Sequence, residues 1–346
     1  MNYKIKEISQ IVNGSTPSTS NSAFWNGNII WITPKDLTNF SERYIYKGHI
    51  NITQEGYKSC STKLVPKGTI LLSSRAPIGY IAIAGNELCT NQGFKSIICN
   101  EKVNNFYLYY WLLKNVDYLK SISSGATFKE LSKDTLENVE INLPSLTEQQ
   151  HIVNTIGTLD DLIENITNQN NKILEIIENI FSNLKESNIM LKDICEIKYG
   201  KSITASKLDN NNKYLVYGGN GIIGTLDDFM FDKSKISISC RGAASGNILL
   251  TTPFSTISSN SLYLNLYDES LTLPLYSFLL KAGLNNYVTG SAQPQITIEN
   301  IQSLKVPILD DYKNNNYDSL IALINNNKEK LNKLNLIKQD LLSKYF

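Results

Sequence analysis

The sequence predicts an α+β fold in which two tandem, structurally repeated globular domains are joined by two long helices packed as an antiparallel coiled coil. Three observations predict it. The chain has 346 residues, more than the roughly 100–200 of a single domain. Its two halves share an internal repeat, and each half ends in a segment with heptad spacing. We place the domains at residues 1–146 and 188–309, and the helices at residues 147–187 and 310–346.

The internal repeat starts near the beginning of each half. The run KEISQIVNG at Lys6–Gly14 matches KDICEIKYG at Lys192–Gly200. Later, two β-prone apolar runs each end in an arginine before a turn, at Gly68–Arg75 and at Lys235–Arg241. Two shorter matches follow, Thr90–Gln92 with Ser259–Ser261 and Ser124–Thr127 with Thr289–Ala292. The chain is therefore predicted to consist of two similar globular units, each followed by a tail.

Each tail has the pattern of a long helix with one apolar face. In the first tail, Ser145–Glu148 and Thr147–Gln150 both fit a capping box at a helix start. Heptad seam positions follow at Ile156, Ile163, Asn170, Ile177 and Leu184, and less regularly in the second tail at Leu320, Asn327, Leu334 and Leu341. A long helix with a single apolar stripe needs a partner, so we expect the two helices to pair with each other.

An antiparallel pairing of these helices predicts a specific register. We expect Asn170 to lie opposite Asn327, where the two amides satisfy each other and define the register at some cost in stability. The same register brings Ile163 opposite Leu334. The alternative is that each asparagine meets water at a wet seam.

Composition excludes several classes of protein. With 33 Lys and Arg against 32 Asp and Glu, and 42% hydrophobic residues, the chain is neither disordered nor a uniformly basic nucleic-acid coat. Its five cysteines include no Cys-x-x-Cys pair, which indicates reduced thiols and argues against a disulfide framework or a zinc ribbon. No apolar run is long enough for a membrane span, and the N-terminus has no export signal. We therefore expect a cytoplasmic protein.

Familiar catalytic patterns are absent from the sequence. The two histidines, His49 and His151, are too few for a His-based triad or a His-rich metal site. Gly200–Ser202 lacks the leading glycine of a phosphate-binding loop, and Tyr217–Gly221 is a Gly-rich run typical of a turn. Glu196–Lys198 lacks the preceding aspartate of a metal-dependent nuclease. We therefore predict no catalytic residue, no metal and no cofactor.

The remaining candidates suit a surface that reads a polymer. Arg75 and Arg241 occupy equivalent places after a strand, and an arginine fork can bind phosphate or the O6/N7 edge of guanine. A lone arginine or amide is more often a solvated or capping group, but the duplicated placement strengthens the case for this pair. The full candidate set for contact with nucleic acid is Thr16, Lys35, Arg75, Asn91, Gln92, Thr127, Phe128, Lys129, Lys201, Tyr217, Asn220, Arg241, Asn260, Gln293 and Gln295.

Six motifs form a recognisable set: Gly14–Pro17, Trp31–Leu37, Gly68–Ile83, Thr90–Lys95 and, most specifically, Ser124–Leu131 with Leu143–Ile152. In these motifs, and over essentially its whole length, the chain resembles the specificity (S) subunit of Type I restriction-modification systems. The second half departs from the pattern, because Gln293–Gln295 stands in place of Phe128–Glu130. The resemblance implies two tandem target-recognition domains, each followed by a long helix, in a non-catalytic subunit that binds double-stranded DNA.

The resemblance also implies an assembly. One such subunit is expected to bind two methyltransferase subunits, and restriction subunits for cleavage. The methyl donor, ATP and Mg²⁺ are therefore expected only in those partners, and no membrane partner is expected. The two domains are expected to read a bipartite DNA target, with the helices setting the gap between its two halves.

Two other functions stay open on the sequence alone. One is a stand-alone DNA-modifying enzyme, a small methyltransferase or nuclease with its own recognition domain, although methyl-donor and nuclease motifs are missing. The other is a structural homodimer whose helices pair between chains. An assay for methyl transfer by the purified chain tests the first, and its mass in solution tests the second.

Overall fold

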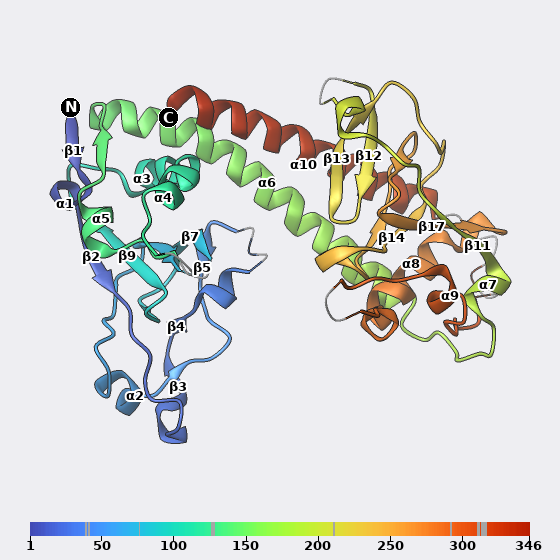
Figure 1. Cartoon of the computed structure of the whole chain (residues 1–346), viewed down its shortest axis with the longest axis horizontal. Coiled ribbons are helices and arrows are strands. Elements are labelled where there is room, and N and C mark those ends of the chain that lie inside the picture. The colour runs from blue at the N-terminus through green and yellow to red at the C-terminus, as the bar shows by residue number, and fades with distance from the viewer. Residues whose placement is uncertain are drawn as a thin grey trace. The chain divides into compact units, whose positions relative to one another are not determined.

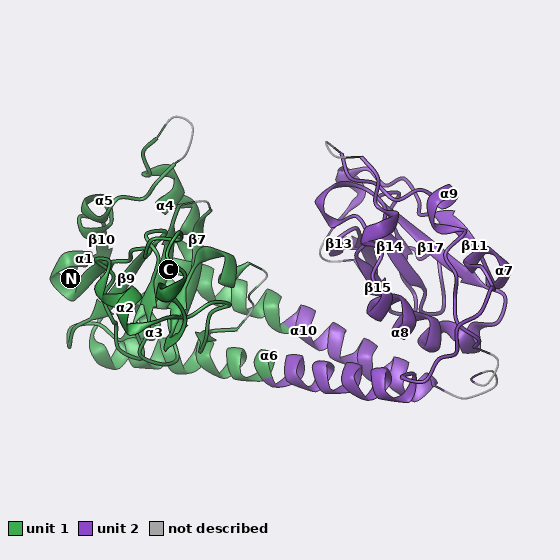
Figure 2. Cartoon of the chain, turned by 90° about the horizontal axis from the view of Figure 1, so that it is seen from below, with its two compact units in different colours: residues 1–164, 334–346 green, residues 165–333 purple. Residues whose placement is uncertain are grey.

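The computed structural model describes residues 1–38, 40, 42–75, 77–125, 129–209, 212–290, 293–309, 312 and 317–346. The fold is α+β, and the chain divides into two compact units, unit 1 with residues 1–164 and 334–346, and unit 2 with residues 165–333 (Figure 2). Two long helices, α6 (Leu146–Ile180) and α10 (Asp318–Tyr345), are labelled in Figure 1, and each contributes one part to unit 1 and the other to unit 2 (Figure 2).

Unit 1 is built around a five-stranded sheet. In spatial order its strands are β2 (Ser9–Asn13), β9 (Phe94–Cys99), β6 (Ile70–Ser74), β7 (Ile78–Ala84) and β5 (Tyr44–Ile45). Neighbouring strands are antiparallel except β5, which runs parallel to β7. All residues of the central strand β6 are buried, as its Ile-Leu-Leu start favours.

Shorter elements surround this sheet. Two small strand pairs are the parallel β4 (Trp31–Ile32) with β8 (Cys89–Thr90) and the antiparallel β1 (Asn2–Lys4) with β10 (Glu140–Asn142). The other elements are β3 (Trp25–Ile29), α1 (Ile5–Ile8), α2 (Gln54–Lys58), α3 (Asn105–Lys114), α4 (Val116–Ser121) and α5 (Lys133–Glu137). Leu108 of α3 shares one hydrophobic core with Ile83 of the sheet and Ile156 of α6. The start of α6 is therefore part of the core of unit 1.

Unit 2 repeats this plan. Its main sheet has, in spatial order, β11 (Cys195–Tyr199), β17 (Ser261–Leu266), β14 (Ile236–Ser239) and β15 (Ile248–Leu250). A second sheet places β12 (Tyr214–Gly218) between β13 (Gly221–Leu226) and the parallel β16 (Thr256–Ile257). The helices are α7 (Leu191–Ile194), α8 (Thr272–Ala282) and α9 (Ile298–Ile301). Ile238 of β14, Leu275 of α8 and Ile177 of α6 belong to one core.

The predicted repeat is confirmed by the strand registers. Ser9 of β2 lies opposite Cys99 of β9. The residue aligned with Ser9 is Cys195 of β11, which lies opposite Leu266 of β17. In both units a one-turn helix, α1 or α7, leads directly into this strand. The two aligned runs therefore form the same element in the two units.

One match within the repeat is wrong. The sequence alignment made Asn91 equivalent to Asn260. In unit 1, however, it is the Gly93 carbonyl that accepts the amide of Ser74 at the end of β6. In unit 2 the Asn260 carbonyl accepts the equivalent amide, that of Cys240. Asn260 therefore corresponds to Gly93, because the strand ladder defines the register and a short run of small polar residues does not.

The antiparallel helix pair is confirmed. In unit 2, Asn327 Nδ2 of α10 donates a hydrogen bond to Asn170 Oδ1 of α6 at 2.9 Å, so the two amides satisfy each other as predicted. In unit 1, Lys338 Nζ lies 2.6 Å from Asp160 Oδ1. The end of α10 thus lies beside the first half of α6, and the start of α10 beside its second half (Figures 1 and 2).

The predicted seam residues differ in burial. Ile156 and Ile177 are buried in the cores of units 1 and 2, respectively. The half-buried seam residues are Ile163, Leu320, Leu334 and Leu341. Leu184 is the exception, because α6 ends at Ile180 and not at residue 187. The prediction of Leu184 as a seam residue is therefore wrong.

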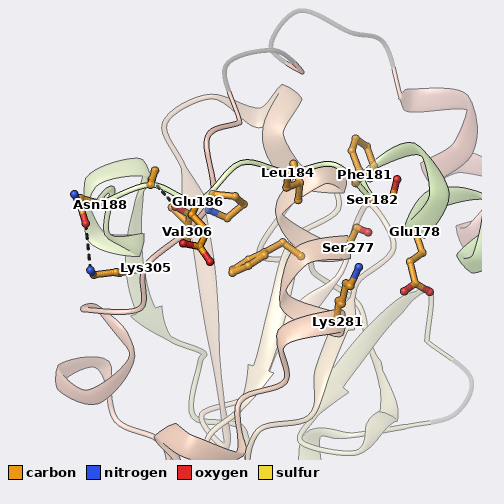
Figure 3. Close-up of a pocket in the computed structure, with 13 residues that line it drawn as sticks. Glu178, Phe181, Ser182, Leu184, Glu186, Asn188, Ser277, Lys281, Lys305 and Val306 are labelled. Carbon is orange, nitrogen blue, oxygen red and sulfur yellow. Dashed lines mark hydrogen bonds between the residues drawn. The ribbon is translucent and has the colours of Figure 1, made fainter.

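The early end of α6 has a packing cause. The ring of Phe181 packs edge-on against Tyr312 and Tyr317, with centroids 5.0 Å and 5.3 Å apart, so the chain turns into the core of unit 2 at this point. Leu184 lies beyond the helix and lines a pocket of about 650 Å³ together with Phe181 and Ser277 (Figure 3). Heptad spacing can continue past the end of a helix, because it reports residue order and not where aromatic packing ends the helix.

Candidate nucleic-acid interface

Three segments of unit 1 meet where β6 ends, a place that we call the β6 end. The amide of Ser74, the last residue of β6, donates to the carbonyl of Gly93 in the β8–β9 turn at 2.7 Å. Its carbonyl accepts the amide of Leu131 at 2.9 Å, directly after a hairpin at residues 124–130. Arg75 follows at once and is half-buried. The strand, the turn and the hairpin therefore surround this arginine.

Charged side chains are concentrated at the β6 end. Arg75 Nη1 lies 3.5 Å from Glu130 Oε2, and these side chains are 40% and 41% exposed. Lys95 Nζ lies 3.5 Å from Glu130 Oε1 and 3.3 Å from Ser74 Oγ, and its side chain is only 6% exposed. Burial lowers the pKa of Lys95, and Glu130 opposes this effect. Two cations thus share one carboxylate, and Arg75 is the cation that a ligand can reach.

The β8–β9 turn brings further candidates to the same place. The Thr16 hydroxyl donates to the side-chain oxygen of Gln92, which is exposed. The Asn91 side-chain oxygen accepts the Gly93 amide of its own turn at 2.9 Å, so this oxygen shapes the turn and the NH₂ group stays able to donate to a ligand. Lys35 is exposed in the 3₁₀ turn Pro34–Leu37, whose proline ring borders the β8–β9 turn.

The remaining candidates of unit 1 are Thr127, Phe128 and Lys129. Lys129 is exposed and directly precedes Glu130. Thr127 and Phe128 lie outside the described residues, so their part in the site stays a prediction. Lys129 therefore adds a third cation at the rim of the β6 end.

Unit 2 has an equivalent place, which we call the β14 end. Arg241 follows β14 and is exposed. It lies opposite Gln295 in an isolated bridge, just as Arg75 lies opposite Glu130. The neighbouring amide of Gly242 donates to a carbonyl of the hairpin at residues 289–295 at 3.0 Å. Gln293 and Gln295 are exposed, so the hairpin presents amides beside the arginine.

The other exposed candidates of unit 2 border the β14 end. The Lys201 carbonyl accepts an amide from the turn that carries Asn260. Asn220 lies in the β12–β13 turn, where the Gly219 carbonyl accepts a hydrogen bond from the Asn247 side chain. The backbone carbonyl of Asn247 accepts the amide of Ser239 at the end of β14. Lys201, Asn220 and Asn260 are all exposed. They extend the polar surface around Arg241.

Tyr217 was predicted to contact a ligand, and this prediction is wrong. Its side chain is 3% exposed and packs with Ile257 and Tyr263. Its hydroxyl accepts the Thr252 amide at 3.1 Å. The Gly-rich run was expected to be a turn throughout, but its first residues belong to β12, where the residue facing the core cannot also face solvent.

Sequence reasoning missed Lys95 and Glu130. Both lie in motifs that carry the resemblance, but a lysine in a strand and a glutamate after a loop usually face solvent. The signal that could have found Lys95 is its place in the run Phe94–Cys99, where every other residue except Ser96 is apolar. A single charge in such a run must be buried with a partner or must interrupt the strand.

Other kinds of site lack support in the described part of the chain. No group of three or more His, Cys, Asp or Glu side chains there could hold a metal ion. None of the described helices is both long enough and apolar enough to cross a membrane. The pocket in Figure 3 lies between the end of α6 and α8, and none of the candidate contact residues lines it.

The chain is similar in sequence to known proteins. The family model for the Type I restriction modification DNA specificity domain matches residues 1–175 and 185–339. The chain is 51% identical over 182 residues to the MjaIX specificity subunit of Methanocaldococcus jannaschii. This match covers 52% of this chain and 42% of that protein. It is 22% identical over 334 residues to the EcoprrI specificity subunit of Escherichia coli, covering 87% of this chain and 82% of that protein.

A solved structure shares the fold across the whole chain. The S subunit of a Type I restriction-modification system from M. genitalium superposes with a TM-score of 0.57 at 18% identity, covering 100% of this chain and 96% of that one. The match to the M. jannaschii relative, by contrast, spans less than half of that protein. Because the family model covers both repeated halves, the chain belongs to the Type I restriction-modification DNA specificity family.

Proposed function

We propose that this chain is a non-catalytic specificity subunit that reads a bipartite target in double-stranded DNA. The observation that carries the proposal is the duplicated placement of Arg75 and Arg241. Each arginine follows a central strand, Arg75 directly and Arg241 after Cys240, and lies opposite a hairpin residue in the same register. A duplicated fold that presents the same group twice suits a ligand with two similar parts, which is what a two-part DNA site offers.

The chemistry of the β6 and β14 ends suits base and phosphate recognition. An arginine fork matches O6 and N7 of guanine in the major groove, and a side-chain amide matches N6 and N7 of adenine. Lysines nearby add phosphate contacts that orient the protein without reading the sequence. The two ends carry different residues, a carboxylate and Lys129 in unit 1 against two glutamines in unit 2. The two half-sites are therefore expected to differ in sequence.

The proposal extends to partner subunits. Relatives are named as specificity subunits of restriction enzymes, and we propose that this chain assembles in the cytoplasm with two methyltransferase subunits and with restriction subunits. The methyl donor, ATP and Mg²⁺ then act in those partners. Exposed apolar side chains of α6 and α10 occur in both units, Leu162, Leu336 and Ile337 in unit 1 and Ile176, Ile180 and Leu323 in unit 2. Such side chains suit packing against helices of a partner. Phe181, directly after α6, is buried and therefore cannot contact a partner in this way.

The function is tested by mapping modified bases. The chain is co-expressed with the methyltransferase subunit of its own system in a host that lacks one, and the host genome is sequenced for methylated positions. We expect one bipartite motif. Arg75→Ala should degrade one half of the motif and Arg241→Ala the other, because each arginine belongs to one domain. The proposal fails if no recurrent motif is modified or if both variants affect the same half.

A stand-alone DNA-modifying enzyme is the alternative, and the family match gives it no support. The control is the purified chain without partners, incubated with a labelled methyl donor and duplex DNA. Methyl transfer by the chain alone would favour the alternative. Its mass in solution tests a homodimeric scaffold in the same preparation.

A further inference from the structure

Two residues outside the candidate set occupy equivalent places at the β6 and β14 ends. Lys95 of β9 lies opposite Leu72 of β6. The same register in unit 2 places Leu262 of β17 opposite Ile238 of β14. Lys95 and Leu262 are therefore counterparts, and both are buried.

A second pair of equivalent residues, Glu130 and Gln295, lies in the hairpins. Glu130 lies opposite Arg75, and Gln295 lies opposite Arg241, in isolated antiparallel bridges. Side chains of directly opposed residues are neighbours. The hairpins close in the same way, because each of these two residues exchanges a pair of backbone hydrogen bonds with the residue that starts its hairpin.

The two differences between the units, Lys95 against Leu262 and Glu130 against Gln295, compensate each other in charge. Unit 1 combines an accessible arginine with the buried Lys95 and the carboxylate of Glu130. Unit 2 combines an accessible arginine with the apolar Leu262 and the neutral Gln295. Arg75, Lys95 and Glu130 together therefore carry one net positive charge, and so do Arg241, Leu262 and Gln295, although the two sets are built from different residues.

We propose that Lys95 and Glu130 are positioning residues of the DNA-reading end of unit 1. Lys95 fixes Glu130 and neutralises it, and Glu130 orients the guanidinium of Arg75 towards DNA. Gln295, which lies opposite Arg241, performs this task for Arg241 without a charge. This inference rests on the proposed function, because it names the residues that make Arg75 a base reader and not only a phosphate contact.

The geometry explains why both residues are needed. A carboxylate beside the arginine limits the directions of the planar fork, and a bidentate contact with guanine depends on that direction. An unneutralised carboxylate at this place would also repel the phosphates of DNA. The buried ammonium group removes this repulsion without competing for DNA, because only 6% of the Lys95 side chain is exposed.

The test compares single and paired substitutions in the full chain assembled with its methyltransferase subunits. Glu130→Gln should raise affinity for a random-sequence duplex, because the β6 end gains one net positive charge. One added phosphate contact steepens the salt dependence by up to about 0.9 in log–log slope, about threefold between 50 and 200 mM salt. It should also relax base preference in one half of the methylated motif. Lys95→Leu should instead weaken binding to the same duplex.

The double variant Lys95→Leu/Glu130→Gln copies the composition of unit 2, and it decides between positioning and simple structural support. We expect its salt slope and its base preference to return towards those of the unmodified chain. Losses of base preference that merely add up in the double variant, or a base preference unchanged in Glu130→Gln, would overturn the inference. Thermal unfolding of each variant identifies losses that come from misfolding.

A reciprocal variant in unit 2 needs no change to a buried group. Gln295→Glu should weaken binding to the random-sequence duplex, and its effect on base preference should fall on the other half of the motif. An effect on the same half as Glu130→Gln would contradict the assignment of one end to each half-site. If the unmodified assembly methylates no motif, the proposed function itself fails. If the assembly does methylate a motif, but Glu130→Gln and Gln295→Glu change the base preference in the same half of it, only the inference fails.

Discussion

Lys328 of α10 is a lysine whose ammonium group is enclosed by unit 2. Its Nζ donates to the Leu250 carbonyl at the end of β15. Burial lowers its pKa to about 8, because the charged form loses hydration that one carbonyl does not replace. The residue therefore connects α10 to the recognition domain at a cost in stability.

Replacing Lys328 by Met should remove a pH dependence of folding. The pKa in the folded chain is about 8 and lies below the unfolded value of about 10.4. Protonation therefore favours the unfolded chain, and stability falls as pH decreases from about 10.4 to 8, then stays level with respect to this group. As the pH decreases across this window, we expect the free energy of unfolding of Lys328→Met to rise by about 2 kcal/mol relative to that of the unmodified chain.

The measurement is urea unfolding at a series of pH values, with Lys330→Met as the control, because Lys330 is exposed on the same helix. Parallel stability curves for Lys328→Met and the unmodified chain would contradict the prediction.

At the scale of elements, polar contacts hold the two long helices in register. In unit 2 this contact is the Asn170–Asn327 pair. In unit 1, Asp160 of α6 accepts a hydrogen bond from Tyr110 Oη of α3 at 2.7 Å and lies 2.6 Å from Lys338 Nζ of α10. The Asp160 side chain is only 4% exposed. A helix pair with these contacts cannot slide by one turn without leaving buried polar groups unpaired.

Lys338→Met should therefore be strongly destabilising. It leaves the buried Asp160 carboxylate without its cation, which costs about 3–5 kcal/mol in the free energy of unfolding. The double variant Asp160→Leu/Lys338→Met should be less destabilised than Lys338→Met, because no uncompensated charge remains. Denaturant unfolding measures both, and Lys333→Met at an exposed position of α10 serves as the matched control. A loss below about 1 kcal/mol for Lys338→Met would refute the assignment.

At the scale of the whole molecule, α6 belongs to both units and is continuous over 35 residues. At about 1.5 Å per residue it is roughly 52 Å long, longer than one turn of DNA. A continuous helix resists compression, so its length should limit the gap between the two half-sites of the proposed DNA target.

Deleting one heptad from α6 near Ile173, with the matching heptad of α10, should shorten the preferred gap. Seven residues correspond to about 10 Å of helix, or about 3 base pairs. The motif methylated by the shortened chain with its partners gives the new gap, while the two half-site sequences should stay the same. An unchanged gap would show that the helices do not measure the distance.

The sequence by itself determined the duplicated organisation and the helix pairing. Both are periodicities of residue type, and a pattern such as Ile156 to Ile177 at heptad spacing needs no knowledge of distant contacts. The Asn170–Asn327 register followed from the same spacing. Arg75 and Arg241 were found because a repeat aligns them without any coordinates.

Only the tertiary structure decided what surrounds those arginines. Strand pairing turned Tyr217 into the core, moved the counterpart of Asn91 by two residues and brought Lys95 and Glu130 to the β6 end. Aromatic packing around Phe181 ended α6 before Leu184. The physical reason is that register and burial depend on contacts between residues far apart in the chain, which local spacing does not encode.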